Sequence, residues 1–440
     1  MRSFWIFAPF LASNVQASFY LLTDNWVGTS FLSEFTWENI ADPTHGRVNY
    51  LPQSESLARG LTVASSNSLV LKADSTTVLS PSGPGRDSNR IMSRKQFGHN
   101  TILVADIKHM PFGCGTWPAL WTTNVGTWPN DGEVDILEGV NIETPNVMTL
   151  HTGANCTMPL SRSQKGTAVT TDCYWLTNGN AGCGVISENQ SSYGDSFNNV
   201  GGGWYAMERT PTFIKVWFWS RNDPLTPADV TTPGQAVINS DNWGVPSAFF
   251  PNTQCDIASK FGAHNVIINL TFCGDWAGAV YGTGGCPGTC IDNVNNNPSA
   301  FANAYWDIAA IRMYALSGSV DSKLPSTSST TTLASATSAA RLSSACRVTT
   351  SISTSPSTTS TPTTHTTTST PTTTTTALSS ATPSTRLVSV CRAKTSTSTS
   401  LITTSTPTTL TTTSTPTIST TPLTSATPRT TLHNSQYDIG

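Results

Sequence analysis

Short apolar runs separated by turn-forming residues are the feature of this sequence that most constrains its fold. Each run is rich in Val, Ile, Phe or Trp and is about the length of one β-strand. The clearest of them span residues 101–107, 213–219, 265–272 and 308–314. Gly-, Pro- and Ser-rich segments lie between the runs, and no stretch keeps a helical period beyond about a dozen residues. The pattern predicts an all-β fold, either a sandwich or a barrel.

A change of composition near residue 318 limits the part of the chain that can fold in this way. The residues before it mix Trp, Phe, Tyr, Gly and Asn, whereas those after it are mostly Ser, Thr, Pro and Ala. Such a segment cannot bury enough apolar surface to offset its chain entropy. We therefore predict one folded domain over residues 18–317, followed by a disordered Ser/Thr/Pro-rich tail over residues 318–440.

The predicted tail contains a repeat of 45 residues. Residues 333–347 match residues 378–392, and a partial third copy begins at Leu423. The composition is typical of an O-glycosylated stalk rather than of a folded repeat. Cys346 and Cys391 occupy equivalent positions in the first two copies, and pairing within the chain or between chains is open.

The N-terminus has the features of a signal peptide. A short basic start, residues 1–3, precedes an apolar stretch over residues 4–12, and small residues follow at Val15 and Ala17. We predict a signal peptide over residues 1–17; the alternative is a buried N-terminal strand. No later apolar run reaches the roughly 18 residues of a membrane helix. The protein is expected to be secreted, to the extracellular space or the cell wall, without a membrane span.

The number of cysteines is consistent with a secreted protein. Eight of the ten lie in the predicted domain, at positions 114, 156, 173, 183, 255, 273, 286 and 290. This even number predicts up to four disulfides, although the spacing does not give their pairing. Cys286 and Cys290 have the spacing of half a zinc site, but a second such pair and a nearby His are missing, which favours disulfides. Sequons at Asn155, Asn189 and Asn269 are consistent with a secreted glycoprotein.

The charge pattern argues against several classes of partner. The formal net charge is −3, and only 11% of the residues are charged. A chain of this kind has no electrostatic reason to bind nucleic acid or anionic membranes. A neutral ligand fits it better.

Three acidic residues lie close together in the run Gly-Glu-Val-Asp-Ile-Leu-Glu-Gly. On a regular strand Glu133 and Asp135 share a face, whereas Glu138 points to the opposite one. One β-bulge between Asp135 and Glu138 would return all three to the same face. Glycoside hydrolysis needs two carboxyl groups across one glycosidic bond, so the run predicts a catalytic pair. The alternatives are solvated acids on an exposed strand or a calcium loop, whose usual spacing this run does not follow.

Aromatic residues near these acids strengthen the catalytic interpretation. Trp121 and Trp128 precede the acids, and Trp276 follows in a Gly-containing segment. Sugar rings stack their C–H faces on indole, although each tryptophan could instead pack in the core. His151 lies where a paired strand could bring it beside the acids, but a lone His is more often a structural residue.

With these residues in view, the sequence resembles glycoside hydrolase family 16. The run from Glu133 to Glu138 is similar to the signature of that family in its bulged form, with two residues between the Asp and the second Glu. Other segments resemble the fungal (basidiomycete) endo-β-1,3-glucanases or laminarinases of the family. They are residues 42–49, 80–86, 113–119, 148–156 and 272–278. The resemblance covers about residues 19–316.

The resemblance implies a β-jelly-roll sandwich of two curved antiparallel sheets with a concave substrate cleft. It assigns Glu133 as the nucleophile, Glu138 as the general acid/base and Asp135 as the residue that orients the nucleophile and tunes its charge. It implies further cleft residues at Trp121, Trp128, Trp276, His151 and Arg90. Of these, His151 matches a residue on the acid/base side and Arg90 matches a cleft arginine.

The resulting expectation is a retaining endo-glycosidase that hydrolyses internal β-1,3 linkages of laminarin-like β-glucans, with β-1,4 linkages next to β-1,3 as a further target. We expect it to act as a monomer without a metal or organic cofactor. Two alternatives stay open: a cell-wall glucan transglycosylase of the same fold, and a non-catalytic glucan-binding wall glycoprotein.

Overall fold

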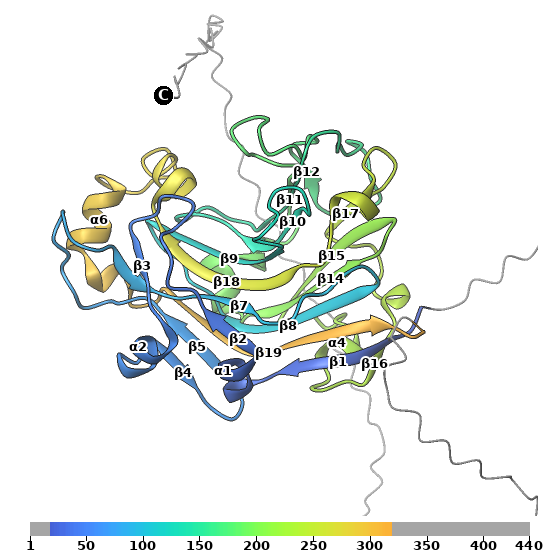
Figure 1. Ribbon diagram of the computed structural model, residues 1–440, viewed down its shortest axis with the longest axis horizontal. Coiled ribbons are helices and arrows are strands. Elements are labelled where there is room, and N and C mark those ends of the chain that lie inside the picture. The colour runs from blue at the N-terminus through green and yellow to red at the C-terminus, as the bar shows by residue number, and fades with distance from the viewer. Residues whose placement is uncertain (1–17, 319–440) are drawn as a thin grey trace, which may run out of the picture. The chain divides into compact units, whose positions relative to one another are not determined.

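The computed structural model describes residues 18–318 of the chain (Figure 1). The predicted signal peptide, residues 1–17, lies outside the described residues. So do residues 319–440, which hold the 45-residue repeat, Cys346, Cys391 and all but one position of the predicted tail.

Two antiparallel sheets dominate the described residues (Figure 1). The strands of the first sheet are β1 (Tyr20–Trp26), β4 (Thr62–Ala64), β5 (Leu69–Lys72), β8 (Thr101–His109), β14 (Gly203–Arg209), β15 (Phe213–Ser220), β16 (Val237–Ile238), β17 (Ala248–Pro251) and β19 (Tyr305–Leu316). They run in the order β16-β1-β19-β8-β14-β15-β17, with β5 paired to β19 and β4 paired to β5.

The second sheet runs in the order β12-β13-β11-β10-β9-β18-β7-β2. Its strands are β2 (Phe35–Trp37), β7 (Arg90–Ser93), β9 (Thr116–Thr123), β10 (Glu133–Glu138), β11 (Val147–His151), β12 (Thr167–Ala168), β13 (Val185–Ile186) and β18 (Asn265–Phe272). A separate parallel pair joins β3 (Val48–Tyr50) to β6 (Arg86–Ser88). The four runs singled out in the sequence all form strands, within β8, β15, β18 and β19, which confirms the all-β prediction and selects the sandwich.

The main core lies between the two sheets. Successive side chains of a strand point to opposite faces, so Val266 and Ile268 of β18 enter the core while Asn269 points to the other face. Tyr205 and Met207 of β14 meet them from the first sheet. A face of the second sheet is thereby left outside the core, and we call it the outer face.

The first sheet is covered on both sides. Its face away from the main core carries a second apolar cluster that includes Trp204, Trp217 and Trp219. Residues of the segment 221–247 cover this cluster, and Trp243 packs edge-on against both Trp217 and Trp219 at ring-centre distances of 5.3 and 5.7 Å. The outer face of the second sheet is therefore the sheet surface that is available to bind a ligand.

The helices of the described residues are short, and the longest α-helix has seven residues. The α-helices are α1 (Phe31–Glu34), α2 (Gln53–Ala58), α3 (Gly194–Asn199), α4 (Ala228–Thr231), α5 (Ile257–Lys260) and α6 (Cys290–Asn296). Single turns are η1 (Gly28–Ser30), η2 (Gln190–Ser192), η3 (Ser240–Asn242), η4 (Gly274–Gly278) and η5 (Pro298–Phe301). Among the described residues, no helix is both long and apolar enough to cross a membrane.

All eight cysteines of the domain form disulfides, as predicted. The pairs are Cys114–Cys286, Cys156–Cys255, Cys173–Cys183 and Cys273–Cys290. The two cysteines with zinc-like spacing, Cys286 and Cys290, thus bond to two different partners. Each pair includes a residue in a loop next to a strand of the second sheet, so the bonds restrain the loops around that sheet.

The three sequons differ in their surroundings. Asn155 is exposed and Asn189 is half-buried, whereas Asn269 is only 7% exposed in the middle of β18. The Oδ1 atom of Asn269 accepts a hydrogen bond from Trp121 Nε1 at 2.7 Å. A glycan on Asn269 is incompatible with this packing, so that sequon is a chance match.

Candidate active site

Strand β10 carries the predicted β-bulge. Against β9, Asp135 pairs with Trp121 and Leu137 pairs with Leu120, so Ile136 is the extra residue. Against β11, the register also shifts between Asp135 and Glu138. Ile136 and Leu137 are both fully buried in the main core. Because two consecutive side chains turn inward, Glu138 returns to the outer face that carries Asp135.

Each of the two glutamates accepts a hydrogen bond from an indole. Trp128 Nε1 donates to Glu133 Oε2 at 2.8 Å, and Trp117 Nε1 donates to Glu138 Oε1 at 2.8 Å. Both carboxylate side chains are partly exposed. They therefore face solvent from between aromatic side chains rather than lie sealed in the core.

Asp135 and His151 form an ion pair beneath the glutamates. Asp135 is 2% exposed and His151 is 7% exposed, and His151 Nε2 lies 3.4 Å from Asp135 Oδ2. The other ring nitrogen, Nδ1, lies 2.9 Å from Asn180 Oδ1 and acts as the donor, since this oxygen only accepts. Burial lowers the pKa of His151, but Asp135 above all, with Glu133 and Glu138, more than offsets this and raises the pKa to about 9. The imidazole is therefore charged at neutral pH.

The surroundings raise the pKa of both glutamates, by different amounts. Burial, and then the charge of Asp135, raises the pKa of Glu133 to about 7. The same two causes raise the pKa of Glu138 well above its usual range. The indole donors and the charge of His151 act in the opposite direction on both groups. Both carboxyl groups therefore hold a proton more readily than an ordinary glutamate does, as a general acid requires.

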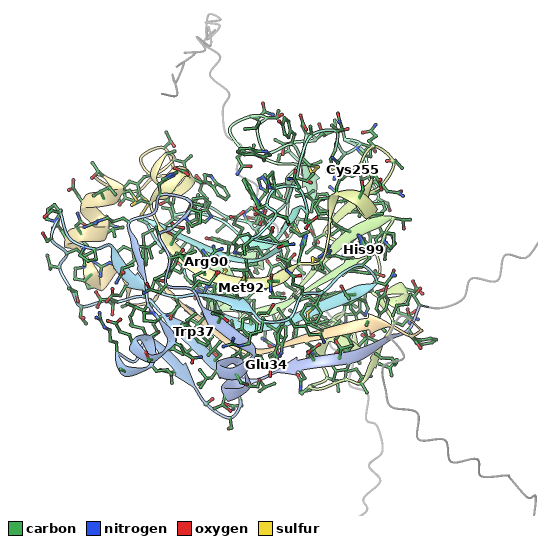
Figure 2. All side chains as sticks on the ribbon, in the orientation of Figure 1. Glu34, Trp37, Arg90, Met92, His99 and Cys255 are labelled. Atoms are coloured by element: carbon green, nitrogen blue, oxygen red, sulfur yellow. A yellow bond between two sulfur atoms is a disulfide. The ribbon has the colours of Figure 1, made fainter. Side chains whose placement is uncertain are left out.

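Trp121 lies between the acids and a buried ion pair. It pairs in register with Asp135, and its indole nitrogen donates to Asn269. The guanidinium of Arg90 lies 5.0 Å from the centre of its ring and forms an ion pair with Glu38 at 2.7 Å. Figure 2 shows Arg90 and Met92 on β7, the strand next to β18. The stacked guanidinium holds the indole in place.

Two further tryptophans extend the aromatic surface. Trp276 packs edge-on against Trp117 at a ring-centre distance of 5.7 Å, on the Glu138 side. Trp175 packs against Trp128 at 5.2 Å, on the Glu133 side. The two carboxyl groups therefore lie between two pairs of indoles.

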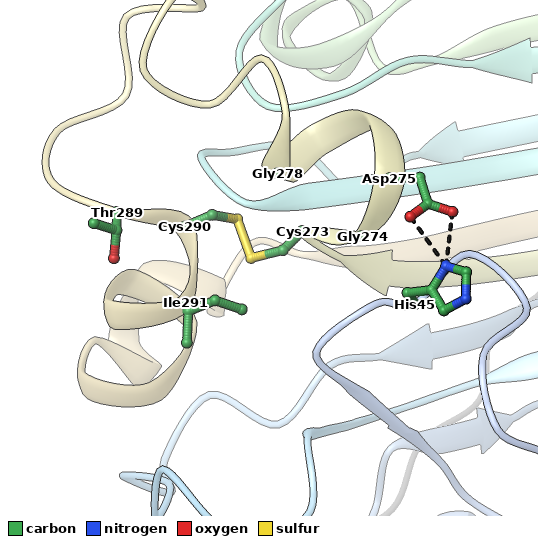
Figure 3. Close-up of a pocket in the computed structure, with 8 residues that line it drawn as sticks. All are labelled: His45, Cys273, Gly274, Asp275, Gly278, Thr289, Cys290 and Ile291. Carbon is green, nitrogen blue, oxygen red and sulfur yellow. Dashed lines mark hydrogen bonds and ion pairs between the residues drawn. A yellow bond between two sulfur atoms is a disulfide. The ribbon is translucent and has the colours of Figure 1, made fainter. Parts of the chain in front are cut away.

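A contact between His45 and Asp275 joins two loops beside Trp276. His45 Nδ1 is 2.9 Å from Asp275 Oδ2, and the two residues line a surface pocket together with Cys273, Ile291 and their neighbours (Figure 3). Since Asp275 precedes Trp276 in η4, this contact restrains the turn that carries the indole.

All eight residues predicted for the site lie in this region. They are Glu133, Asp135, Glu138, Trp121, Trp128, His151, Trp276 and Arg90. The register of β11 sets His151 opposite Glu133, and its imidazole lies beside Asp135.

The sequence prediction missed several contributors. Trp117 was not assigned to the site, although it lies four residues before Trp121 on one strand and so shares its face. Trp175, Asn180 and Asn269 reach the site through contacts between distant segments. Nothing local in the sequence marks them.

One group of side chains has the donor atoms of a metal site. Ligand atoms of Glu133, Asp135 and His151 lie within 4.8 Å of one another. Metal binding to His151 would require a free ring nitrogen, whereas the surrounding carboxylates favour its doubly protonated form. With both ring nitrogens protonated, the imidazole offers no lone pair to a metal, so the donor set fits a metal poorly.

Comparison with known proteins agrees with this geometry. Residues 35–314 match the family described as "XgeA-like, catalytic GH16 domain". The endo-1,3(4)-β-glucanase XgeA of Emericella nidulans is 38% identical over 315 residues, which is 69% of this chain and 49% of that protein. This chain thus aligns with about half the length of that relative.

Two solved structures are also similar. Laminarinase 16A of Phanerochaete chrysosporium, with 6-O-glucosyl-laminaritriose in its donor and acceptor sites, is 62% identical, with a TM-score of 0.66. An elongating family 16 β-1,3-glucosyltransferase is 41% identical, with a TM-score of 0.62. Each alignment covers 67% of this chain and 99% of the other. With the bulged strand, the jelly-roll sandwich and the family match together, the chain belongs to glycoside hydrolase family 16.

Proposed function

We propose that this chain is a retaining endo-glycosidase that hydrolyses internal β-1,3 linkages of β-glucans, and β-1,4 linkages next to β-1,3. One observation carries the proposal: a bulged strand presents Glu133 and Glu138 on one face, each beside an indole donor. A retaining mechanism needs one ionised and one protonated carboxyl group at the same bond.

In the first step, Glu138 donates its proton to the glycosidic oxygen while the carboxylate of Glu133 attacks the anomeric carbon. The bond between that carbon and the oxygen breaks, and the aglycone leaves as an alcohol. In the second step, Glu138 takes a proton from water, whose oxygen attacks the same carbon and displaces Glu133. The product keeps its anomeric configuration, and both carboxyl groups return to their starting states.

The charges of the site suit this change of role. The charge of Glu133 is among the causes that raise the pKa of Glu138. Once Glu133 is esterified that charge is gone, so the pKa of Glu138 falls and the group can act as a base. The Asp135–His151 pair lies beside both carboxyl groups and acts on the pKa of each.

The substrate class follows from the lining of the site. Four half-buried indoles, those of Trp117, Trp121, Trp128 and Trp276, offer flat apolar surfaces to sugar rings. The 62% identity to a laminarinase solved with a β-1,3-glucan fragment supports a laminarin-like substrate. Four disulfides in the domain support a secreted enzyme. We propose that it acts as a monomer.

Transglycosylation is the second candidate, because an elongating family 16 β-1,3-glucosyltransferase is 41% identical to this chain. A sugar hydroxyl would then replace water in the second step. Timed product profiles from laminari-oligosaccharides separate the two. Shorter products alone support hydrolysis, and products longer than the substrate support transfer.

The proposed nucleophile is tested by Glu133→Ala. We expect a folded protein whose release of reducing sugar from laminarin falls by about 10⁴-fold or more. Glu34→Ala, at an exposed position on α1, is the matched control and should keep full activity. Undiminished turnover by Glu133→Ala would refute the assignment. Tight glucan binding by a wild-type protein that cleaves nothing would favour the non-catalytic alternative.

A further inference from the structure

At the bulge of β10, two backbone groups form hydrogen bonds to the side chain of Asn146. The backbone N–H of Glu138 donates to Asn146 Oδ1 at 2.8 Å. On the other side of the bulge, the carbonyl of Ile136 accepts from Asn146 Nδ2 at 2.9 Å. A single side chain therefore holds the backbone on both sides of Leu137, the residue between them.

Asn146 is held rigidly in turn. It is fully buried, and its backbone N–H donates to the hydroxyl of Ser192 at 3.0 Å. Its carbonyl accepts from the N–H of Ser187 at 2.9 Å. Its backbone and its side-chain amide therefore all have partners, and the amide can adopt one orientation only. An N–H group must face its oxygen, and a carbonyl must face its nitrogen.

The choice of an amide has a physical reason. A bulge disturbs the ladder of a β-strand and leaves backbone groups without their regular partners. A side-chain amide carries one acceptor and one donor in the arrangement of a peptide group, so it can replace the missing stretch of neighbouring strand. Leu has the branched shape of Asn and is somewhat larger, but it has neither group, and Asp keeps the acceptor while losing the donor.

We propose that Asn146 is a positioning residue for the general acid/base. It acts by fixing the bulge that turns Glu138 to the face of Glu133. Without the amide, the strand segment from Ile136 to Glu138 relaxes, and the carboxyl group of Glu138 moves relative to the glycosidic oxygen. The inference rests on the proposed role of Glu138, and it concerns a residue that does not itself touch the substrate.

Positioning of the acid has a kinetic signature that loss of stability lacks. A glycosidic bond with a poor leaving group needs the proton of Glu138, whereas a dinitrophenyl glycoside leaves without it. The ratio kcat/KM reports the first step only. A misplaced Glu138 therefore lowers kcat/KM for laminarin and a phenyl β-laminaribioside, but hardly for a 2,4-dinitrophenyl β-laminaribioside.

The experiment uses the full-length protein and measures kcat/KM for these three substrates. Asn146→Leu and Asn146→Asp are the test variants, and Glu138→Ala is the reference for loss of the acid. Ser192→Ala is the matched control, because it removes the bond to the backbone N–H of Asn146 and leaves the amide contacts in place. Thermal unfolding of every variant measures the loss of stability.

We expect kcat/KM of both Asn146 variants to fall by about 100-fold for laminarin and the phenyl glycoside, as for a displacement of about 1 Å. For the dinitrophenyl glycoside we expect a fall of less than about threefold, and for Ser192→Ala the same small change on all substrates. Equal losses on all three substrates in the Asn146 variants would overturn the inference. If Glu138→Ala itself shows no dependence on the leaving group, the proposed role of Glu138 is wrong instead.

Should neither Asn146 variant fold, hydrogen exchange of the wild-type protein decides. The N–H of Glu138 should be protected to the level of the core strands, because its acceptor is a fully buried side chain. Exchange at the rate of an exposed loop would show that Asn146 does not hold the bulge, and would overturn the inference.

Discussion

The two indole donors provide a way to tell the nucleophile from the acid by pH dependence alone. Trp128 donates to Glu133 and Trp117 donates to Glu138, in both cases at 2.8 Å. Replacement of either tryptophan by Phe keeps an aromatic ring and removes the donor. Because each donor favours the ionised carboxylate, its loss raises the pKa of the carboxyl group it contacted.

The size of the effect follows from the hydrogen bond that is lost. A bond to a charged group contributes about 1.5–3 kcal/mol in a buried setting, and one pKa unit corresponds to about 1.4 kcal/mol. Both carboxyl groups are partly exposed, so solvent replaces part of the lost interaction. We therefore expect each replacement to raise one apparent pKa by about 0.5–1 unit.

The two replacements should move opposite limbs of the pH profile of kcat/KM on laminarin. Activity needs Glu133 ionised, so a higher pKa of Glu133 in Trp128→Phe moves the acidic limb to higher pH. Activity also needs Glu138 protonated, so a higher pKa of Glu138 in Trp117→Phe moves the alkaline limb to higher pH. The limbs report apparent pKa values of the interacting pair, and the comparison therefore rests on which limb moves.

Trp121→Phe is the matched control for this experiment. Its indole lies on the same face but donates to Asn269, so its loss should lower kcat/KM without moving either limb. If Trp117→Phe moved the acidic limb and Trp128→Phe the alkaline one, the roles of Glu133 and Glu138 would be exchanged. A shift of the same limb in both variants would refute the reasoning altogether.

Two further predictions concern stability around the site. Replacement of both Cys173 and Cys183 by Ser removes the disulfide that closes the loop carrying Trp175. We expect the free energy of unfolding to fall by about 2–3 kcal/mol and the activity on laminarin to fall as well. An unchanged denaturation midpoint would contradict this. A Cβ atom at Gly139 would lie 2.7 Å from the fully buried ring of Tyr193, so Gly139→Ala should cost about 1–3 kcal/mol by overpacking. A melting temperature equal to that of the wild type would show that the ring can yield. Gly98→Ala is the steric control for the second change, because nothing lies near its Cβ position and its backbone is not left-handed.

Local features of the chain were sufficient to predict the sheets and the acids. The apolar run at residues 265–272 coincides with β18, because period, length and residue type are local properties. The bulge could also be predicted. Glu133 and Asp135 are two residues apart and share a face, whereas Glu138 is three residues beyond Asp135 and needs one extra residue to join them. Steric alternation along a strand allows no other regular solution.

The surroundings of the acids were decided by tertiary structure. The pairing of β10 with β11 sets His151 opposite Glu133, and the fold of distant loops brings Asn180 to the imidazole and Trp175 to Trp128. The pairing of the eight cysteines has the same origin. Such contacts depend on register and loop paths over long sequence separations, which no local pattern encodes.

Asn146 shows most clearly the difference between what the sequence determines and what the tertiary structure decides. By sequence it is one asparagine in a turn-forming segment, with nothing to separate it from many others. In the fold it is fully buried and completes the backbone hydrogen bonds of the bulge. The sequence by itself determined that the strand needs an extra residue, because side chains alternate along any strand. Only the tertiary structure decided which side chain holds that residue in place, because burial and partner depend on the return path of the chain.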